Sequence, residues 1–441
     1  MLQDLGEGEV IQPSSSKRWL VVPLLLAAFF GAYFLTRSLL DEPLTVGSLT
    51  DSEREINRRA RFRDYCPSME TPSDPIRVSA GPTSDPKNPC ASAESCTLVP
   101  IFFGTNRQFL FQLREPEWFS ADRSRKLCLG RALVTVPKSA NRRRGEIPRP
   151  NYWDLYALAT PLGGDPRRHF TIPFGGISLF RDAYEMAAEI RRHYNVAGEF
   201  RDHAFIFIHG YNTTFEHALH RAAQIAFDLG VDGEAFGTAH LYSWPSGGGL
   251  ADYPYDFDSA RLAVEHLREY LELVVGMTPT KNVHIIAHSM GAWLLMSALK
   301  EWNKSVVGHR VLNQIILAAP DIDIGEFEKL AANVHQLARG VTLYASQNDL
   351  ALWASIRFHR GTNRAGFVSR SGPAIFRDID SIDITAIGTD VFSNGHSEYV
   401  RKEVLNDIAL LFRKGERPPH ARTPMLERVK QSELEYWRYP K

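Results

Sequence analysis

From residue 170 onward, short uninterrupted apolar runs alternate with segments in which apolar residues recur every three or four positions. The runs span residues 204–208, 239–244, 283–287, 314–319, 341–345 and 382–387. Strands buried on both faces of a parallel sheet are typically continuous apolar runs of this kind. The intervening segments, residues 183–194, 257–274, 292–299 and 399–412, have the composition of crossover helices. The pattern predicts an α/β fold with a mostly parallel central sheet and helices on both faces.

The chain before residue 170 divides into segments of different character. Residues 19–35 are continuously apolar, residues 37–97 include a stretch dense in Pro, Ser and Asp, and residues 98–103 and 127–136 are strand-like. We therefore expect a short N-terminal segment at 1–18, a transmembrane anchor at 19–36, a stalk or linker at 37–97 and the folded domain at 98–412. The polar tail at 413–441 is expected to be an extended or short helical appendage.

The apolar segment at 19–35 would span roughly 26 Å as a helix, close to the hydrocarbon thickness of a bilayer. A cleavable signal peptide would have a shorter apolar core and a clear small-x-small cleavage site, and a buried core helix would carry a polar face. Both stay open as alternatives to an uncleaved anchor. Lys17 and Arg18 precede the segment and only Arg37 follows closely. This bias favours an inside N-terminus, so we expect a single-pass membrane protein with an extracytoplasmic, in a bacterium periplasmic, domain.

The four cysteines, Cys66, Cys90, Cys96 and Cys128, all precede the predicted crossover region. An even number allows three complete pairings, so one or two disulfides are expected outside the cytoplasm. Alternatively, Cys128 is a small buried apolar residue, because it lies between two leucines.

Charge and ligand spacing narrow the function further. Lys and Arg total 51 against 51 Asp and Glu, so no net charge favours nucleic acid as a partner. No cysteine spacing is typical of zinc, and His217 and His220 form an isolated pair, so no metal or other cofactor is expected. Two basic clusters are either solvated loops or contacts for an anionic lipid or substrate: Arg142, Arg143 and Arg144, and Arg357, His359, Arg360, Arg364 and Arg370.

The strongest chemical signal surrounds Ser289. An apolar strand at 283–287 leads into Ala287-His288-Ser289-Met290-Gly291 and then into a helix-compatible segment. This order is typical of a nucleophile elbow, in which a sharp turn raises a serine hydroxyl above the sheet. The first small residue is alanine instead of glycine, which adds one methyl group. We interpret Ser289 as a nucleophile.

A serine hydroxyl needs a base, and a carboxylate must orient that base. His396 follows the last predicted strand and precedes a predicted helix, which is where this fold places its histidine. Between Ser289 and His396 in chain order, Asp349 follows the strand at 341–345, and Asp321 and Asp323 follow the strand at 314–319. Asp349 is the preferred acid, and the earlier pair stays open.

The strand at 204–208 ends in His209-Gly210-Tyr211-Asn212, and a strand followed by His-Gly commonly precedes an oxyanion loop. The expected oxyanion donors are the backbone N–H groups of Tyr211 and Met290. The segment 246–255 contains three consecutive glycines and is either a mobile rim of the site or a plain flexible loop.

In these motifs the chain resembles the bacterial esterase/lipase-like α/β-hydrolase family long catalogued as a domain of unknown function. The resemblance rests on VPIFFGTNR (99–107), FIHGYN (207–212), YSWPS (242–246), AHSMG (287–291), AAPDID (318–323) and YASQND (344–349). It covers residues 98 to about 412 and implies an α/β-hydrolase fold with a triad at Ser289, Asp349 and His396. It implies no particular substrate.

Together these features predict a serine hydrolase that cleaves a carboxylic ester, which could be a lipid, through an acyl-serine intermediate. Acyl transfer or amide cleavage on the same triad is an alternative, because the pocket selects the acceptor. A non-catalytic envelope interaction protein on a hydrolase scaffold is another, although such a protein would not need a complete triad. The oligomeric state is not predicted.

Overall fold

The computed structural model describes most of the predicted domain. The described residues are 90, 96–110, 118–138, 142–148, 165, 168–173, 175–196, 200–230, 234–302, 312–332, 334–387 and 402–440. The predicted anchor at 19–36 and most of the predicted stalk lie outside these ranges. Within them, no helix is both long and apolar enough to cross a bilayer.

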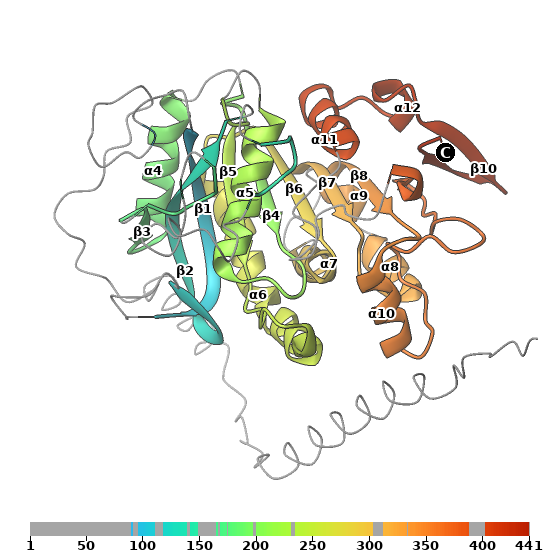
Figure 1. Cartoon of the computed structure of the whole chain (residues 1–441), viewed down its shortest axis with the longest axis horizontal. Coiled ribbons are helices and arrows are strands. Elements are labelled where there is room, and N and C mark those ends of the chain that lie inside the picture. Colours follow the sequence, from blue (N-terminus) through green and yellow to red (C-terminus); the bar gives the residue numbers. More distant parts are fainter. Residues whose placement is uncertain are drawn as a thin grey trace, which may run out of the picture. The chain divides into compact units, whose positions relative to one another are not determined.

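One sheet of eleven strands forms the centre of the described domain, in the order β10-β11-β9-β8-β7-β6-β4-β5-β1-β2-β3 (Figure 1). The strands are β1 (Cys96–Phe109), β2 (Phe119–Pro137), β3 (Ile177–Phe180), β4 (His203–Ile208), β5 (Thr238–Ser243), β6 (Asn282–His288), β7 (Leu312–Ala318), β8 (Ala338–Ala345), β9 (Ile379–Asp383), β10 (Glu427–Gln431) and β11 (Leu434–Arg438). In the order across the sheet, every neighbouring pair from β11 to β1 is parallel. The pairs at the two ends, β1–β2, β2–β3 and β10–β11, are antiparallel.

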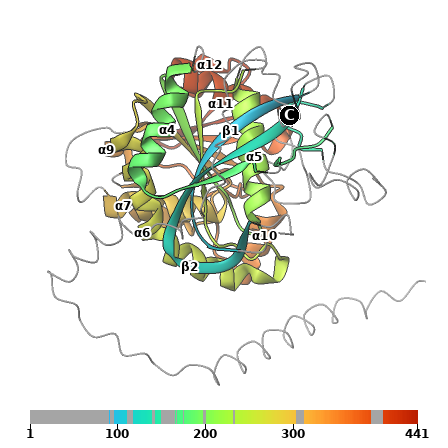
Figure 2. The same cartoon turned by 90° about the vertical axis from the view of Figure 1, so that its left-hand side faces the viewer.

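Helices cover both faces of this sheet, and Figure 2 shows α4 and α5 on opposite sides of it. The helices are α4 (Ala183–Val196), α5 (Phe215–Leu229), α6 (Tyr253–Met277), α7 (Met290–Trp302), α8 (Ile324–Ala331), α9 (Val334–Leu337), α10 (Leu350–Phe358), α11 (Lys402–Lys414) and α12 (Pro419–Arg422), with short 3-10 turns η1 (Leu250–Asp252) and η2 (Thr385–Ile387). Buried side chains of α4, α6 and α7 form one apolar core and those of α5 and α11 form another. The predicted α/β fold, with a mostly parallel sheet and helices on both faces, is confirmed.

The predicted apolar runs correspond closely to the central strands. The run at 204–208 lies in β4, where all five of those residues are buried, and the run at 283–287 lies in β6. The last run differs, because β9 ends at Asp383 and residues 385–387 form η2. The chain therefore turns earlier than the apolar pattern predicts on its way toward residue 388.

The expectation of an appendage at residues 413–441 is wrong. Strands β10 and β11 form a hairpin that continues the central sheet, with Trp437 opposite Ile382 and Arg438 opposite Asp383 of β9. The hairpin lies at the edge of the sheet, so most of its residues are exposed and polar and lack the apolar run of a central strand. Only a few apolar anchors hold it, including Trp437 and the following Tyr439, which are 4% and 2% exposed.

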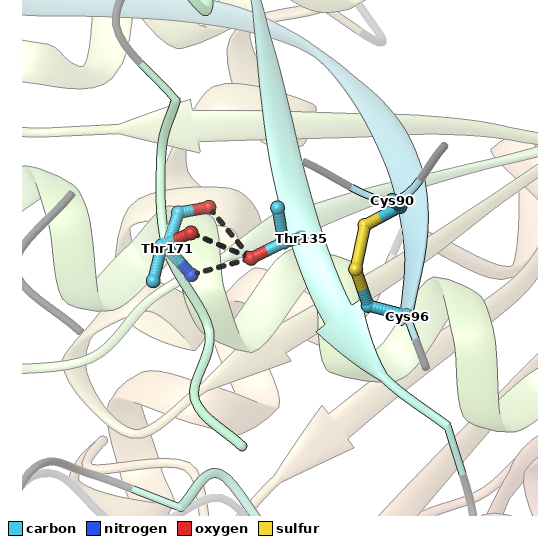
Figure 3. The surroundings of a disulfide bond; sticks show 4 residues. All are labelled: Cys90, Cys96, Thr135 and Thr171. Atoms are coloured by element: carbon cyan, nitrogen blue, oxygen red, sulfur yellow. Dashed lines mark hydrogen bonds between the residues drawn. A yellow bond between two sulfur atoms is a disulfide. The ribbon is translucent and has the colours of Figure 1, made fainter. Parts of the chain in front are cut away.

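Disulfides tie the beginning of the domain together. Cys90 and Cys96 are bonded at the start of β1, beside Thr135 of β2 (Figure 3). The hydroxyl of Thr135 is hydrogen-bonded to the backbone N–H and the hydroxyl of Thr171. Cys128 is also disulfide-bonded, with a partner outside the described residues. The alternative that Cys128 is a free buried apolar residue is therefore wrong.

The first basic cluster is largely internal. Arg142 is buried and donates two hydrogen bonds to the carboxylate of Asp228 near the end of α5. Arg144 bonds to the backbone carbonyl of Asp228, and only Arg143 of the three is exposed. Arg142 thus holds the loop before β3 against α5 and is not a solvated charge or an open lipid contact.

Candidate active site

Ser289 occupies a strained turn between β6 and α7. Its φ is +52°, a left-handed value that costs a non-glycine residue about 1–3 kcal/mol and persists only where neighbours enforce it. The Ser289 N–H donates to Ala318 O at 2.9 Å, and its carbonyl accepts from the N–H groups of Ala292 (3.0 Å) and Asp321 (3.2 Å). The end of β7 and the first turn of α7 therefore fix the serine in the geometry of an elbow.

Two glycines let the backbone close around this turn. A Cβ at Gly291 would lie 2.2 Å from the carbonyl oxygen of His209. The start of α7 can therefore pass this close to the end of β4 only because residue 291 has no side chain. A Cβ at Gly210 would lie 2.9 Å from the Cβ of Ser289. The loop after β4, which carries Tyr211, therefore runs directly against the serine, while Met290 is the first residue of α7.

Asp349 lies after β8 and caps α10. Its side chain is half-buried and accepts a hydrogen bond from the N–H of Leu352 at 2.9 Å. The turn before it is joined to the chain leaving β9, because the N–H of Gln347 donates to the hydroxyl of Thr385 at 3.0 Å. Asp349 thus lies beside the segment that leads toward residue 396.

Asp321, after β7, has a different environment. It is buried, and its carboxylate accepts from the hydroxyls of Tyr253 (2.8 Å) and Ser355 (2.6 Å) and pairs with Arg364 Nε at 3.2 Å. Asp323 caps α8 through the N–H groups of Gly325 and Glu326. Arg364 itself is buried, so this member of the second basic cluster is not a solvated charge.

His396 lies between η2 and α11, outside the described residues. Two other histidines near Ser289 are described, and burial lowers the pKa of both His209 and His288, the latter to about 3. The ring nitrogens of His209 are within hydrogen-bond distance of Gly210 O (2.8 Å) and the Ser243 hydroxyl (3.2 Å). Both rings therefore stay neutral, and His209 supports the loop after β4.

A cavity of about 460 Å³ opens beside Asp321, whose backbone N–H bonds to Ser289. It combines aromatic walls with polar and charged groups, and its lining comprises Tyr253, Phe257, Trp293, Asp321, Ile322, Asp323, Glu326, Phe358, His359, Arg360, Thr362 and Arg364. Pockets with this mixture are suited to amphipathic small molecules. In the described part of the chain, no group of three or more His, Cys, Asp or Glu residues is arranged to hold a metal ion.

The sequence interpretation missed two buried charged residues beside the loop after β4, Arg107 at 1% and Asp256 at 0% exposure. Both bind that loop, through Thr213 and Asn212 respectively. Arg107 lies in one of the blocks that carried the family resemblance, but without a role. Asp256 lies in an amphipathic helix and had no signal, because two of its three partners are backbone N–H groups, which carry no sequence signature.

A family model described as "Alpha/beta hydrolase of unknown function (DUF900)" matches residues 184–414. The chain belongs to this family. The matched part of this DUF900 member runs from α4 to the end of α11 and contains each of the predicted site residues. The resemblance inferred from the sequence motifs is thereby confirmed, and the matched region leaves out β1–β3 and the C-terminal hairpin.

Among curated proteins, none matches this DUF900 member. Similar solved structures include a Pyrobaculum calidifontis esterase, 11% identical, covering 48% of this chain and 76% of the esterase with a TM-score of 0.26. A fungal esterase from Rhizomucor miehei is 9% identical and covers 84% of this chain and 93% of its own, with a TM-score of 0.28. Likenesses this low carry no conclusion about activity.

Proposed function

We propose that the protein is a serine hydrolase that cleaves a carboxylic ester through an acyl-serine intermediate. The observation that carries the proposal is the strained turn at Ser289, with φ +52° and neighbours on both sides that fix it. Such a turn exposes a hydroxyl at the carboxyl end of a parallel sheet, where this fold carries out nucleophilic catalysis. Ser289 is the nucleophile, His396 the general base and Asp349 the residue that orients the histidine.

In the proposed reaction, His396 takes the Ser289 proton as the serine oxygen attacks the ester carbonyl. The carbonyl oxygen becomes an oxyanion, which accepts hydrogen bonds from the N–H groups of Tyr211 and Met290. The carbon–oxygen bond to the alcohol then breaks, and the alcohol leaves with the proton held by His396. Water repeats these steps on the acyl-serine, releasing the acid and restoring the serine.

Two observations favour Asp349 over Asp321 as the acid. Asp321 already pairs with a guanidinium and accepts hydrogen bonds from two hydroxyls. Asp349, in contrast, caps a helix and lies next to the chain that leaves β9. That chain continues through η2 toward residue 396. A carboxylate at this position is suited to accept the imidazole N–H and fix its tautomer.

The cavity beside Asp321 supports an amphipathic ester as substrate. Tyr253, Phe257, Trp293 and Phe358 provide aromatic walls, and charged groups lie around them. We propose that an apolar acyl or alcohol group lies against these rings, as in a lipid ester or a small aryl or alkyl ester.

Covalent labelling tests the assignment of the nucleophile. A fluorophosphonate probe should label the wild-type protein on the peptide that contains Ser289, with loss of labelling in Ser289→Ala. Ser259→Ala is the matched control, because it removes another buried hydroxyl. Ser259 lies on α6 and accepts a hydrogen bond from Arg123 of β2. Labelling that persists in a folded Ser289→Ala protein would rule out Ser289 as the nucleophile.

We also propose that residues 19–36 anchor the protein in a membrane with the hydrolase domain outside the cytoplasm. The disulfide between Cys90 and Cys96 supports an oxidising compartment. The full-length protein should stay with membranes after a high-salt wash, because hydrophobic burial is not screened by salt. Protease added to intact spheroplasts should digest the hydrolase domain, and digestion only after lysis would reverse the orientation.

A further inference from the structure

A buried arginine binds two loops at the carboxyl edge of the sheet. Arg107 of β1 donates from Nη2 to Thr213 O (2.6 Å), from Nη1 to Ser246 O (3.0 Å) and from Nε to the Ser243 hydroxyl (3.0 Å). Thr213 belongs to the loop after β4 and Ser246 to the loop after β5. One guanidinium thus ties the carbonyl groups of both loops to β1.

A buried aspartate binds the same two loops from the other side. Asp256, in the first turn of α6, accepts from the N–H of Asn212 (3.0 Å), the hydroxyl of Ser246 (2.6 Å) and the N–H of Gly247 (2.6 Å). The Ser246 hydroxyl in turn accepts from the N–H of Thr213 at 2.9 Å. The carboxylate therefore accepts hydrogen bonds from N–H and O–H groups of the two loops, while the guanidinium donates to carbonyl oxygens of the same loops.

The position of Tyr211 follows from these contacts. On one side of it, Gly210 runs against Ser289, with room for no side chain. On the other side, Asn212 has a φ of +57° and its N–H is held by Asp256. A non-glycine residue persists in that left-handed conformation where its surroundings enforce it, and here Asp256 supplies part of the enforcement. The peptide unit of Tyr211 is thus bounded by the nucleophile and by Asp256.

We propose that Asp256 and Arg107 are positioning residues of the oxyanion loop, which hold the Tyr211 peptide where its N–H meets the oxyanion formed at Ser289. This inference rests on the proposed hydrolase function and adds a second set of required residues to it. Neither residue touches the substrate. Burial raises the pKa of Asp256 to about 6, so at neutral pH it carries the charge that accepts all three hydrogen bonds.

A matched buried carboxylate elsewhere in the domain separates this role from plain stability. Asp228 near the end of α5 also accepts a backbone N–H, from Gly145 at 2.7 Å, and a side-chain amide, from Gln224 at 2.7 Å. It pairs directly with Arg142. Both Asp228→Asn and Asp256→Asn should therefore lower the melting temperature. Asp228→Asn should leave turnover of a p-nitrophenyl ester within about threefold of wild type.

The test compares Asp256→Asn, Asp256→Glu, Arg107→Lys and Asp228→Asn in the full chain. Asp256→Asn should lower kcat about 100-fold, the cost of losing one oxyanion donor, with KM changed by less than about threefold. Affinity for a boronic-acid transition-state analogue should fall in parallel with kcat, because only the transition state needs the donor. Asp256→Glu should recover part of the loss, and Arg107→Lys should lose kcat by about tenfold or more.

Three outcomes overturn the inference. Folded Asp256→Asn and Arg107→Lys proteins with wild-type kcat would do so, as would an equal loss of kcat in Asp228→Asn. If Asp256→Asn does not fold, Asp256→Glu and Arg107→Lys decide by the same comparison of kcat with analogue affinity. Absence of any Ser289-dependent turnover in the wild-type protein would instead overturn the proposed function, and this inference with it.

Discussion

Asp321 and Asp349 follow neighbouring strands, β7 and β8, at the same edge of the sheet. Asp321 is buried against Arg364, Tyr253 and Ser355, whereas Asp349 is half-buried and caps α10. Sequence position favours Asp349 as the acid of a triad but leaves Asp321 open. The surroundings distinguish them, because a carboxylate held by a guanidinium and two hydroxyls has little capacity left to orient an imidazole.

Loss of the proposed nucleophile or base should have the largest effect on turnover, against which the effects of the carboxylate variants are compared. Ser289→Ala or His396→Ala should lower turnover of a short-chain ester by at least about 10⁴-fold, because the remaining groups cannot form an acyl-enzyme. Circular dichroism should show an unchanged fold. A folded Ser289→Ala protein with near-normal turnover would remove the reason to compare the carboxylates as catalytic groups.

Asp349→Asn separates catalysis from helix capping. Asparagine is as good an N-cap as aspartate, so α10 should keep its cap and the melting temperature should change little. Turnover should nevertheless fall by about 10³- to 10⁴-fold, because the amide favours the wrong imidazole tautomer. Steady-state kinetics on Asp349→Asn and Asp321→Asn side by side checks this. A greater catalytic loss in Asp321→Asn would move the acid to the end of β7.

Asp321→Asn should act mainly on stability. The change leaves the buried guanidinium of Arg364 without its anion, which typically costs about 3 kcal/mol of unfolding free energy. Urea denaturation measures this, and Asp323→Asn is the control, because asparagine preserves the cap of α8. The double variant Asp321→Asn with Arg364→Gln should lose less stability than the sum of the single changes. Additive losses would contradict a coupled pair.

A third carboxylate, Asp256, extends the comparison to pH. Its pKa is raised from 3.8 to about 6 by burial, so between these values the folded protein holds a proton that the unfolded chain has released. Its contribution to the unfolding free energy therefore falls as pH rises from about 4 to 6, by about 3 kcal/mol at most, and is constant above.

Urea denaturation of wild type and Asp256→Asn across that range should show the stability of wild type falling relative to the variant. Neighbouring Arg107 and Tyr211, whose pKa values are about 10 and 12, do not titrate in that range. The nearby carboxylate of Asp252 is present in wild type and variant alike, so it does not contribute to the difference between their stabilities. A stability difference that is independent of pH would contradict the raised pKa.

The sequence predicted the central strands because each is buried on both faces and so reads as an apolar run. The same reasoning failed for β10 and β11, whose edge position leaves most side chains in water. Strand β3 was also missed, since it has four residues and only Phe180 is buried. Burial on two faces leaves a local signal in the sequence, whereas pairing at an edge leaves very little.

The site shows the same limit. The elbow at Ser289 was evident because its small residues, strand and helix are contiguous in the chain. Arg107 and Asp256 were missed because most of their partners are backbone groups, which have no sequence identity. The carbonyl partners of Arg107 in the two loops are more than 100 residues away, and Asp256 binds the backbone N–H groups of Asn212 and Gly247. His396 lies outside the described residues and stays a prediction.

The pairing of β11 with β9 has a consequence for synthesis of the protein. Strand β11, which pairs with the outer edge of β9, follows α11 in the chain, so that edge is covered only after the residues from α11 to β11 have been synthesised. A chain that stops early, after α11, would present unpaired backbone groups of β9, and exposed edges of this kind recruit strands from other molecules. Premature termination here therefore creates an aggregation-prone protein and not merely a shorter one.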